Sequence, residues 1–138
     1  MSNIDMLEFS SNHNNKLFCD SFTTIRRKSN KYVIGNEYEA YIGKHHLGRV
    51  RLIHMSERQP NAQINEIMSR LDVGKPKTYL LTLLKNMYGN YILSEYMLYL
   101  TFEYVSRNPN GQLWMVKNYL DRHDINSTLT PEQAELFS

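Results

Sequence analysis

The feature that most constrains the fold lies in residues 23–42, where short runs with strand character are separated by turn signals. The β-branched run at 23–25 favours an extended backbone and leads directly into three consecutive cations at 26–28. Gly35-Asn36 is a turn signal, and the residues at 37–42 then alternate in polarity. This order predicts the strand–turn–strand opening of a small barrel, with positive charge beside its mouth.

The rest of the chain completes an α+β pattern with a small, mostly antiparallel sheet. Strands are also expected at 6–9, 32–34, 49–55 and 91–105. Helices are expected at 62–71, from Pro76 to about residue 87, and at 113–123, with Thr130-Pro131 starting a short terminal turn. The apolar spacing predicts that positions 64, 67, 68 and 71 face inward in the first helix, and Leu113, Val116 and Leu120 in the last. At 138 residues, this fits a five- or six-stranded open barrel in residues 1–106, with a helical extension at 107–138 packed on the same domain.

Charge and composition narrow the classes of function. The net charge is only +2, but residues 16–58 hold nine Lys and Arg against four Asp and Glu, so positive charge is concentrated there. Cys19 is the only cysteine, which excludes an intramolecular disulfide and fits a cytoplasmic location. No apolar run approaches the length of a membrane span, so no membrane partner is expected. Single glycines and scattered histidines offer neither a phosphate-binding loop nor a metal site, so no cofactor is expected.

Four segments between residues 16 and 105 resemble the ASCH domains of the PUA-like barrel group. They are Thr24-Ile25-Arg26, the segment Tyr32 to Glu37, the helix end Asn86 to Gly89, and the strand around Leu98 to Phe102. The resemblance implies a PUA-like open barrel with two flanking helices.

Some small ASCH proteins hydrolyse the acyl amide of N4-acylated cytidines. Those relatives use the Thr of Thr-Ile-Arg as nucleophile, with a lysine three residues before it and a glutamate ahead of the penultimate helix. Here the lysine position holds Ser21, and the glutamate position falls near Val73, with Asp72 beside it. A threonine hydroxyl needs a base to lose its proton, and Ser21 cannot serve as one. If the chain is an enzyme, the resemblance assigns catalysis to Thr24 and Asp72.

The leading prediction is non-catalytic binding of RNA or single-stranded nucleic acid by the basic residues beside the mouth of the barrel, called the positive lip. Cations hold phosphates by charge, and neighbouring tyrosines stack on bases. The expected binding residues are Arg26, Arg27, Lys28, Lys31, Tyr32, Lys44, Arg49 and Arg51. A solvated strand face, with Glu37 and Glu39 as cross-strand partners, is the competing explanation of the same charges.

Two further functions stay open beside the amidohydrolase. A row of Tyr and Leu at 91–100 would form a protein interface or homodimer contact if one of its faces were exposed. That row suggests an adaptor or inhibitor. A composition high in Asn, Tyr and Met suits a small bacterial or phage accessory protein.

Overall fold

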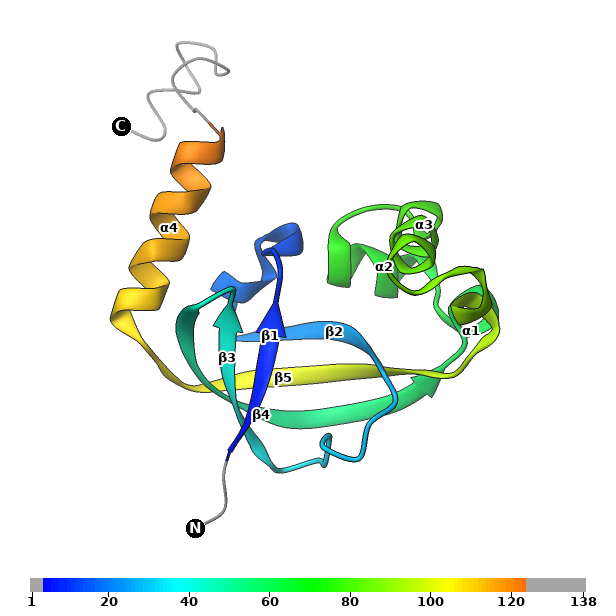
Figure 1. The fold of residues 1–138 in the computed structure, drawn as a ribbon, viewed down its shortest axis with the longest axis horizontal. Helices are drawn as coiled ribbons and strands as arrows, with labels where there is room; N and C mark the ends of the chain where they lie inside the picture. Colours follow the sequence, from blue (N-terminus) through cyan, green and yellow to red (C-terminus); the bar gives the residue numbers. More distant parts are fainter. Residues whose placement is uncertain (1–3, 124–138) are drawn as a thin grey trace.

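The computed structural model describes residues 4–123, which form an α+β fold around one curled five-stranded sheet (Figure 1). The strands are β1 (Asp5–Phe9), β2 (Ser21–Arg27), β3 (Glu37–Ile42), β4 (His45–Arg58) and β5 (Met97–Arg107). The α-helices are α1 (Pro60–Gln63), α2 (Glu66–Val73), α3 (Lys77–Tyr88) and α4 (Pro109–His123). Two 3₁₀ helices, η1 (His13–Phe18) and η2 (Asn90–Ser94), complete the described elements. The predicted start signal at Thr130-Pro131 lies outside the described residues.

The sheet has the strand order β1-β3-β4-β5-β2, so β1 and β2 are its two edges. Only the β1–β3 pair is parallel, and the other three pairs are antiparallel. The sheet curls until its edges approach each other, and the rings of Phe9 on β1 and Phe22 on β2 lie 5.7 Å apart. The result is a half-barrel whose gap lies between the first two strands of the sequence.

Irregularities in β4 account for much of this curl. The β4–β5 register shifts between Arg49 and Val50 and again between Leu52 and His54, and such bulges bend and twist a strand. Gly48 brings β4 unusually close to β5, because a Cβ at this position would lie 2.2 Å from the carbonyl oxygen of Ser106. Any larger residue here would push the two strands apart.

The buried side chains form two clusters. The larger one has members from all five strands and includes Leu7, Tyr38, Leu100 and Phe102. The smaller one joins Ile25 and the start of β5 to the helical segment that follows β4. The cavity described below has residues of both clusters in its walls.

The predicted strands at 6–9, 23–26, 37–42 and 49–55 are present, and so is the helix after Pro76. Three predictions were wrong in detail. Residues 32–34 form a loop, the helix at 62–71 is broken into α1 and α2 around the buried Ile64, and η2 occupies the first part of the strand predicted at 91–105. Short apolar runs do not distinguish a strand from a helical turn, which explains the third error.

The inward faces of two helices were also predicted wrongly. Leu113, Val116 and Leu120 of α4 are exposed, and Met115 is the α4 residue buried in the core. In α2, the predicted Ile67 and Leu71 are exposed, whereas Ser69, Asp72 and Val73 are buried. The buried face of α2 is therefore set by a polar contact, which the apolar pattern does not reveal.

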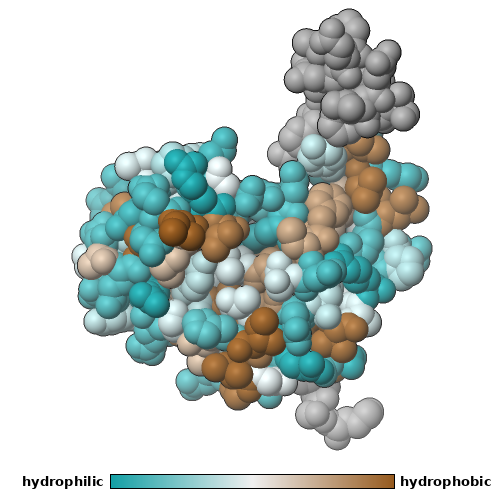
Figure 2. All heavy atoms as spheres, turned by 180° about the vertical axis from the view of Figure 1, so that it is seen from behind, coloured by the Kyte–Doolittle hydropathy of each residue, from teal (hydrophilic) through white to brown (hydrophobic). Residues whose placement is uncertain are grey.

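The Tyr and Leu row offers no exposed face. Met97, Leu98, Tyr99 and Leu100 are all buried, because side chains from both faces of β5 enter the two core clusters. Tyr91 and Tyr96 are exposed, but both precede β5. On the face shown in Figure 2, exposed apolar side chains form separate groups divided by polar ones. Among the described residues, no helix is long and apolar enough to cross a membrane.

Candidate functional site

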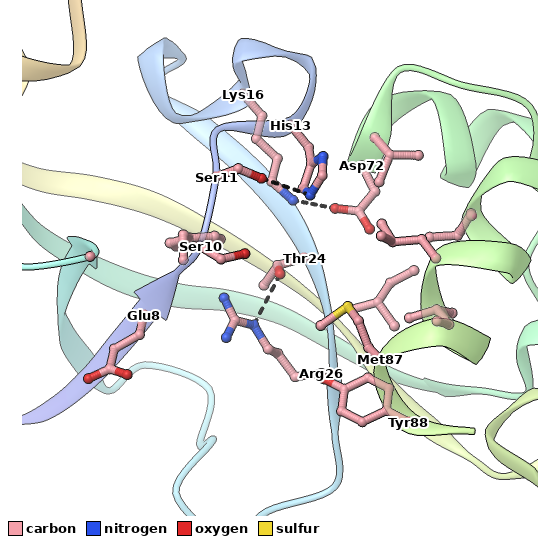
Figure 3. Close-up of a pocket in the computed structure, with 17 residues that line it drawn as sticks. Glu8, Ser10, Ser11, His13, Lys16, Thr24, Arg26, Asp72, Met87 and Tyr88 are labelled. Atoms are coloured by element: carbon pink, nitrogen blue, oxygen red, sulfur yellow. Dashed lines mark hydrogen bonds and ion pairs between the residues drawn. The ribbon is translucent and has the colours of Figure 1, made fainter. Parts of the chain in front are cut away.

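A cavity of about 460 Å³, with both polar and apolar walls, opens in the gap between the two edges of the half-barrel (Figure 3). Its walls come from β1, η1 and β2 on the sheet side and from α2 and α3 on the helix side. A volume of this size lies within the range of small-molecule sites. Its polar lining includes Lys16 from η1, Asp72 from α2, and Thr24 and Arg26 from β2, with Glu8 of β1 and His13 also on the wall.

The fold of η1 places Lys16 on the wall of this cavity. The side-chain oxygen of Asn12 accepts a hydrogen bond from the backbone N–H of Leu17 at 2.8 Å, and the side chain of Asn14 donates to the carbonyl of Arg70 at 3.1 Å. Asn14 and Asn15 both have positive φ, a conformation that asparagine tolerates better than most residues. Together these contacts hold η1 against α2 with Lys16 turned inward.

Lys16 and Asp72 form a buried ion pair. The Lys16 Nζ contacts Asp72 Oδ1, and the two side chains are only 6% and 5% exposed. Burial lowers the pKa of the Lys16 ammonium below its ordinary value, although the Asp72 carboxylate acts in the opposite direction. A lysine with a lowered pKa is better able to accept a proton near neutral pH than a lysine in water.

Thr24 and Arg26 come from one face of β2, because alternate residues of a strand point the same way. Thr24 is buried, and its Oγ1 accepts a hydrogen bond from Arg26 Nε at 3.2 Å. The Arg26 guanidinium also lies over the Phe9 ring, 4.7 Å from its centroid, which fixes its position across the gap. The hydroxyl is therefore oriented by a fixed cation and faces the same cavity as the Lys16–Asp72 pair (Figure 3).

His13 lies above the ion pair at the rim of the cavity. Its Nε2 is hydrogen-bonded to Ser11 Oγ at 3.0 Å (Figure 3). Burial and the nearby Lys16 charge lower the pKa of His13, so its neutral form is favoured. The opposite wall, from α3, is apolar and includes Leu80, Leu83 and Met87. A ligand with one polar end and one apolar end fits such a cavity.

The structure brings three of the predicted site residues together in this cavity: Thr24, Asp72 and Arg26. The other basic residues lie elsewhere. Lys28 pairs with Glu57 at 3.0 Å, and Lys31 Nζ donates to the Met6 carbonyl at 2.9 Å.

Three more predicted residues are also spread over different positions. The Arg27 guanidinium lies 5.6 Å from the centroid of the Tyr88 ring, Tyr32 is buried, and Lys44 lies in the turn between β3 and β4.

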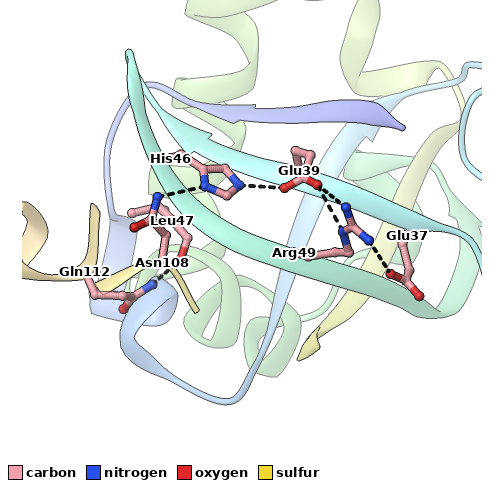
Figure 4. Close-up of polar contacts among 7 residues, drawn as sticks. All are labelled: Glu37, Glu39, His46, Leu47, Arg49, Asn108 and Gln112. Atoms are coloured by element: carbon pink, nitrogen blue, oxygen red, sulfur yellow. Dashed lines mark hydrogen bonds and ion pairs between the residues drawn. The ribbon is translucent and has the colours of Figure 1, made fainter. Parts of the chain in front are cut away.

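Arg49 and Arg51 lie along β4 and are engaged by carboxylates. Arg49 Nη2 is 2.9 Å from Glu39 Oε1, and Arg51 bonds Glu37 and Glu103 at 3.4 Å each (Figure 4 shows the Arg49 contacts). Neither arginine lines the cavity. This is the arrangement of a strand face with cross-strand partners.

Sequence reasoning missed Lys16 and His13. Lys16 precedes Thr24 by eight residues, whereas the ASCH pattern places its lysine three residues before the threonine. At that position Ser21 is exposed at the start of β2. Neither position carries a local signal of burial, because Lys16 follows two asparagines and His13 lies within the polar tract at 10–15.

Comparisons of this chain with protein families, with curated proteins and with solved structures found no match. Within residues 4–123, no group of three or more His, Cys, Asp and Glu side chains is arranged to hold a metal ion. The chemistry of the cavity is therefore inferred from the residues that line it.

Proposed function

We propose that this chain is an ASCH-like domain whose cavity binds an N-acylated nucleoside and hydrolyses its acyl amide. The observation that carries the proposal is the buried Lys16–Asp72 pair on the wall of the cavity that Thr24 also lines. Lys16, delivered by η1, occupies the role that Ser21 cannot fill. The curled five-stranded sheet is compatible with a PUA-like barrel, and it supports the family assignment without testing it.

In the proposed reaction, the neutral Lys16 amine takes the proton of the Thr24 hydroxyl as its oxygen attacks the acyl carbonyl. Asp72 holds the Lys16 Nζ in place and stabilises the ammonium that forms. The Arg26 guanidinium is next to the reacting oxygen and offsets negative charge in the tetrahedral intermediate.

The C–N bond then breaks, and Lys16 returns its proton to the departing amine. Thr24 is left as an acyl ester. A water molecule attacks this ester and gives a proton to Lys16, which passes the proton to the Thr24 oxygen as the ester C–O bond breaks. The products are the carboxylic acid, the free Thr24 hydroxyl and the neutral Lys16 amine. The net change is one water consumed per amide cleaved.

The test is the release of cytidine from N4-acetylcytidine by the purified chain, followed by ultraviolet absorbance. Thr24→Ala is expected to reduce kcat by about 10³-fold or more, since a covalent step cannot proceed without its nucleophile. Thr23→Ala is the matched control, because Thr23 is the adjacent threonine on β2 and does not line the cavity. It is expected to keep the wild-type rate.

The pH dependence supplies a second readout. Because the base must be neutral, kcat is expected to rise with pH through the lowered pKa of Lys16 and then level off. The proposal fails if the wild type does not turn over, or if Thr24→Ala and Thr23→Ala have equal rates.

Binding of nucleic acid by the basic residues is the second candidate function. The observation in its favour is a cavity of about 530 Å³ whose lining includes Lys28, Asn30 and Tyr32, together with Glu57, the exposed ion-pair partner of Lys28. The predicted cations lie on several surfaces, so this proposal rests on the residues at 28–32 and not on a continuous lip.

The test of this second candidate is the binding of a labelled single-stranded RNA, measured by fluorescence anisotropy at several salt concentrations. Lys28→Ala is expected to weaken binding and reduce the salt dependence, whereas Arg51→Ala, on the carboxylate-paired strand face, is expected to leave both unchanged. Equal effects of the two changes would contradict it.

A further inference from the structure

A second cavity adjoins the one that holds Thr24. It has a volume of about 400 Å³ and shares Ser11, His13 and Val73 with the first cavity. It lies where η1 meets the start of α3 and the middle of α4. In Figure 1, η1 is seen between α4 on one side and α2 and α3 on the other. The two cavities are therefore neighbours with His13 between them, and together they are called the groove below.

Each of the two cavities is large enough for a separate chemical unit, since small-molecule sites begin at about 300 Å³. The Lys16–Asp72 pair and Thr24 line only the first part. A substrate that filled only the first cavity would leave the second one without a function. The presence of two cavities indicates a substrate in which the reacting unit is joined to at least one other chemical unit.

The chemistry of the second cavity differs from that of the first. Asn12 and Asn14 also line it, but their side chains are used to hold η1. In contrast, the side chains of Asn15, Lys75 and Asn118 form no hydrogen bond or ion pair within residues 4–123, so they are available to a ligand.

The second cavity also offers aromatic and positive groups. Tyr79, at the start of α3, is 46% exposed and presents a ring to solvent. Lys75 supplies a cation, and none of the described residues that line this cavity is a carboxylate. Side-chain amides bond base edges through both donor and acceptor atoms, tyrosine rings stack on bases, and a lysine holds a phosphate.

We infer that the substrate is a single-stranded oligonucleotide, with the acylated base in the first cavity and a neighbouring nucleotide in the second. The inference rests on the proposed amide hydrolysis and adds the substrate class to it. Tyr79 stacks on the neighbouring base, Lys75 contacts the connecting phosphate, and Asn118 bonds the base edge. His13, whose neutral form is favoured, separates the two units without adding charge.

The experiment compares kcat/KM for two substrates: the nucleoside N4-acetylcytidine, and a single-stranded trinucleotide with N4-acetylcytidine in the middle. The wild type is expected to prefer the trinucleotide by about 10-fold or more, which is the size of one stacking contact plus one phosphate contact. The variant Lys75→Ala/Tyr79→Ala/Asn118→Ala is expected to lose this preference and to keep the wild-type kcat/KM for the nucleoside. An equal kcat/KM for both substrates in the wild type overturns the inference and leaves the proposed hydrolysis intact.

A binding measurement separates this inference from a failure of the proposed chemistry. The Thr24→Ala chain, which cannot form the acyl ester, is titrated with a fluorescent five-nucleotide single strand. Binding that the triple change weakens by about 10-fold or more supports the groove, even if the wild type hydrolyses neither substrate. The inference is refuted by no binding, or by equal binding with and without the triple change.

Discussion

The stability of the buried Lys16–Asp72 pair gives the sharpest test of the structure. Asp72→Leu leaves the Lys16 ammonium in a site where its side chain is only 6% exposed, and Lys16→Met leaves the Asp72 carboxylate in the same position. Removing one partner of such a pair typically costs about 3–5 kcal/mol. Replacing both partners by apolar residues of similar volume is often neutral or stabilising. The double change Lys16→Met/Asp72→Leu is therefore expected to be more stable than either single change.

The size of each single effect has an upper limit, because an isolated buried group can lose its charge. Deprotonating Lys16 at pH 7 costs roughly 4–5 kcal/mol, given the ordinary pKa of a lysine and 1.36 kcal/mol per pKa unit. A loss of this size is a large part of the roughly 5–15 kcal/mol that stabilises a typical domain. The two single variants are thus expected to unfold at much lower urea concentrations than the wild type.

Asp72→Leu also predicts a response to pH. Burial favours the neutral form of Lys16 in the folded chain, whereas the unfolded chain exposes Lys16 as an ammonium. The unfolded chain therefore binds more protons, so stability rises with pH up to about pH 10, with a largest slope of about 1.4 kcal/mol per pH unit.

Urea unfolding followed by far-UV circular dichroism at pH 6 and pH 8.5 measures all four proteins. Lys28 and Glu57 provide the control cycle, because they are paired at 3.0 Å but their side chains are 56% and 52% exposed. Substitutions in that exposed pair are expected to change the free energy of unfolding by no more than about 1 kcal/mol. The reasoning is refuted if the Lys16 and Asp72 losses simply add in the double variant, or if the stability of Asp72→Leu does not rise between pH 6 and pH 8.5.

Two other changes test the packing of the fold. Tyr38→Phe is expected to cost about 1–3 kcal/mol in urea unfolding, because the buried hydroxyl donates to the Lys31 carbonyl at 2.6 Å and accepts from the Val33 N–H at 2.8 Å; an unchanged midpoint would show that this loop is not held by Tyr38. Gly111→Ala is expected to displace the start of α4, because the added Cβ would lie 1.7 Å from the His46 carbonyl oxygen. Hydrogen exchange should then speed up in α4 and not in α3, and equal protection in the two proteins would count against the close approach.

Much of the secondary structure could be predicted from local patterns. The alternation at 37–42 indicated β3, because side chains of a strand point to opposite faces, and the structure buries every second residue there. Pro76 and the apolar spacing after it indicated α3, because proline suits the beginning of a helix. Both signals depend only on residues close together in the chain.

Which face of a helix is buried could not be predicted in the same way. In α4, Met115 enters the core while Leu113 and Leu120 remain exposed. The orientation of α4 is set by contacts with β4, where Gln112 Nε2 donates to the Leu47 carbonyl at 2.7 Å and Trp114 stacks on His45. An apolar stripe predicts the inward face of a helix only where no hydrogen bonds or stacking contacts with neighbouring elements set another orientation.

The sequence by itself determined that Thr24 and Arg26 share one face of a strand, since that follows from the two-residue period of the backbone. Only the tertiary structure decided that Lys16 and Asp72, 56 positions apart, meet beside that face. The physical reason is that a buried charge is tolerated only with an opposite charge next to it. Which two charges meet depends on how the edges of the sheet curl together and on how η1 is held against α2. Neither the curl nor the docking of η1 can be predicted from a local pattern of residues.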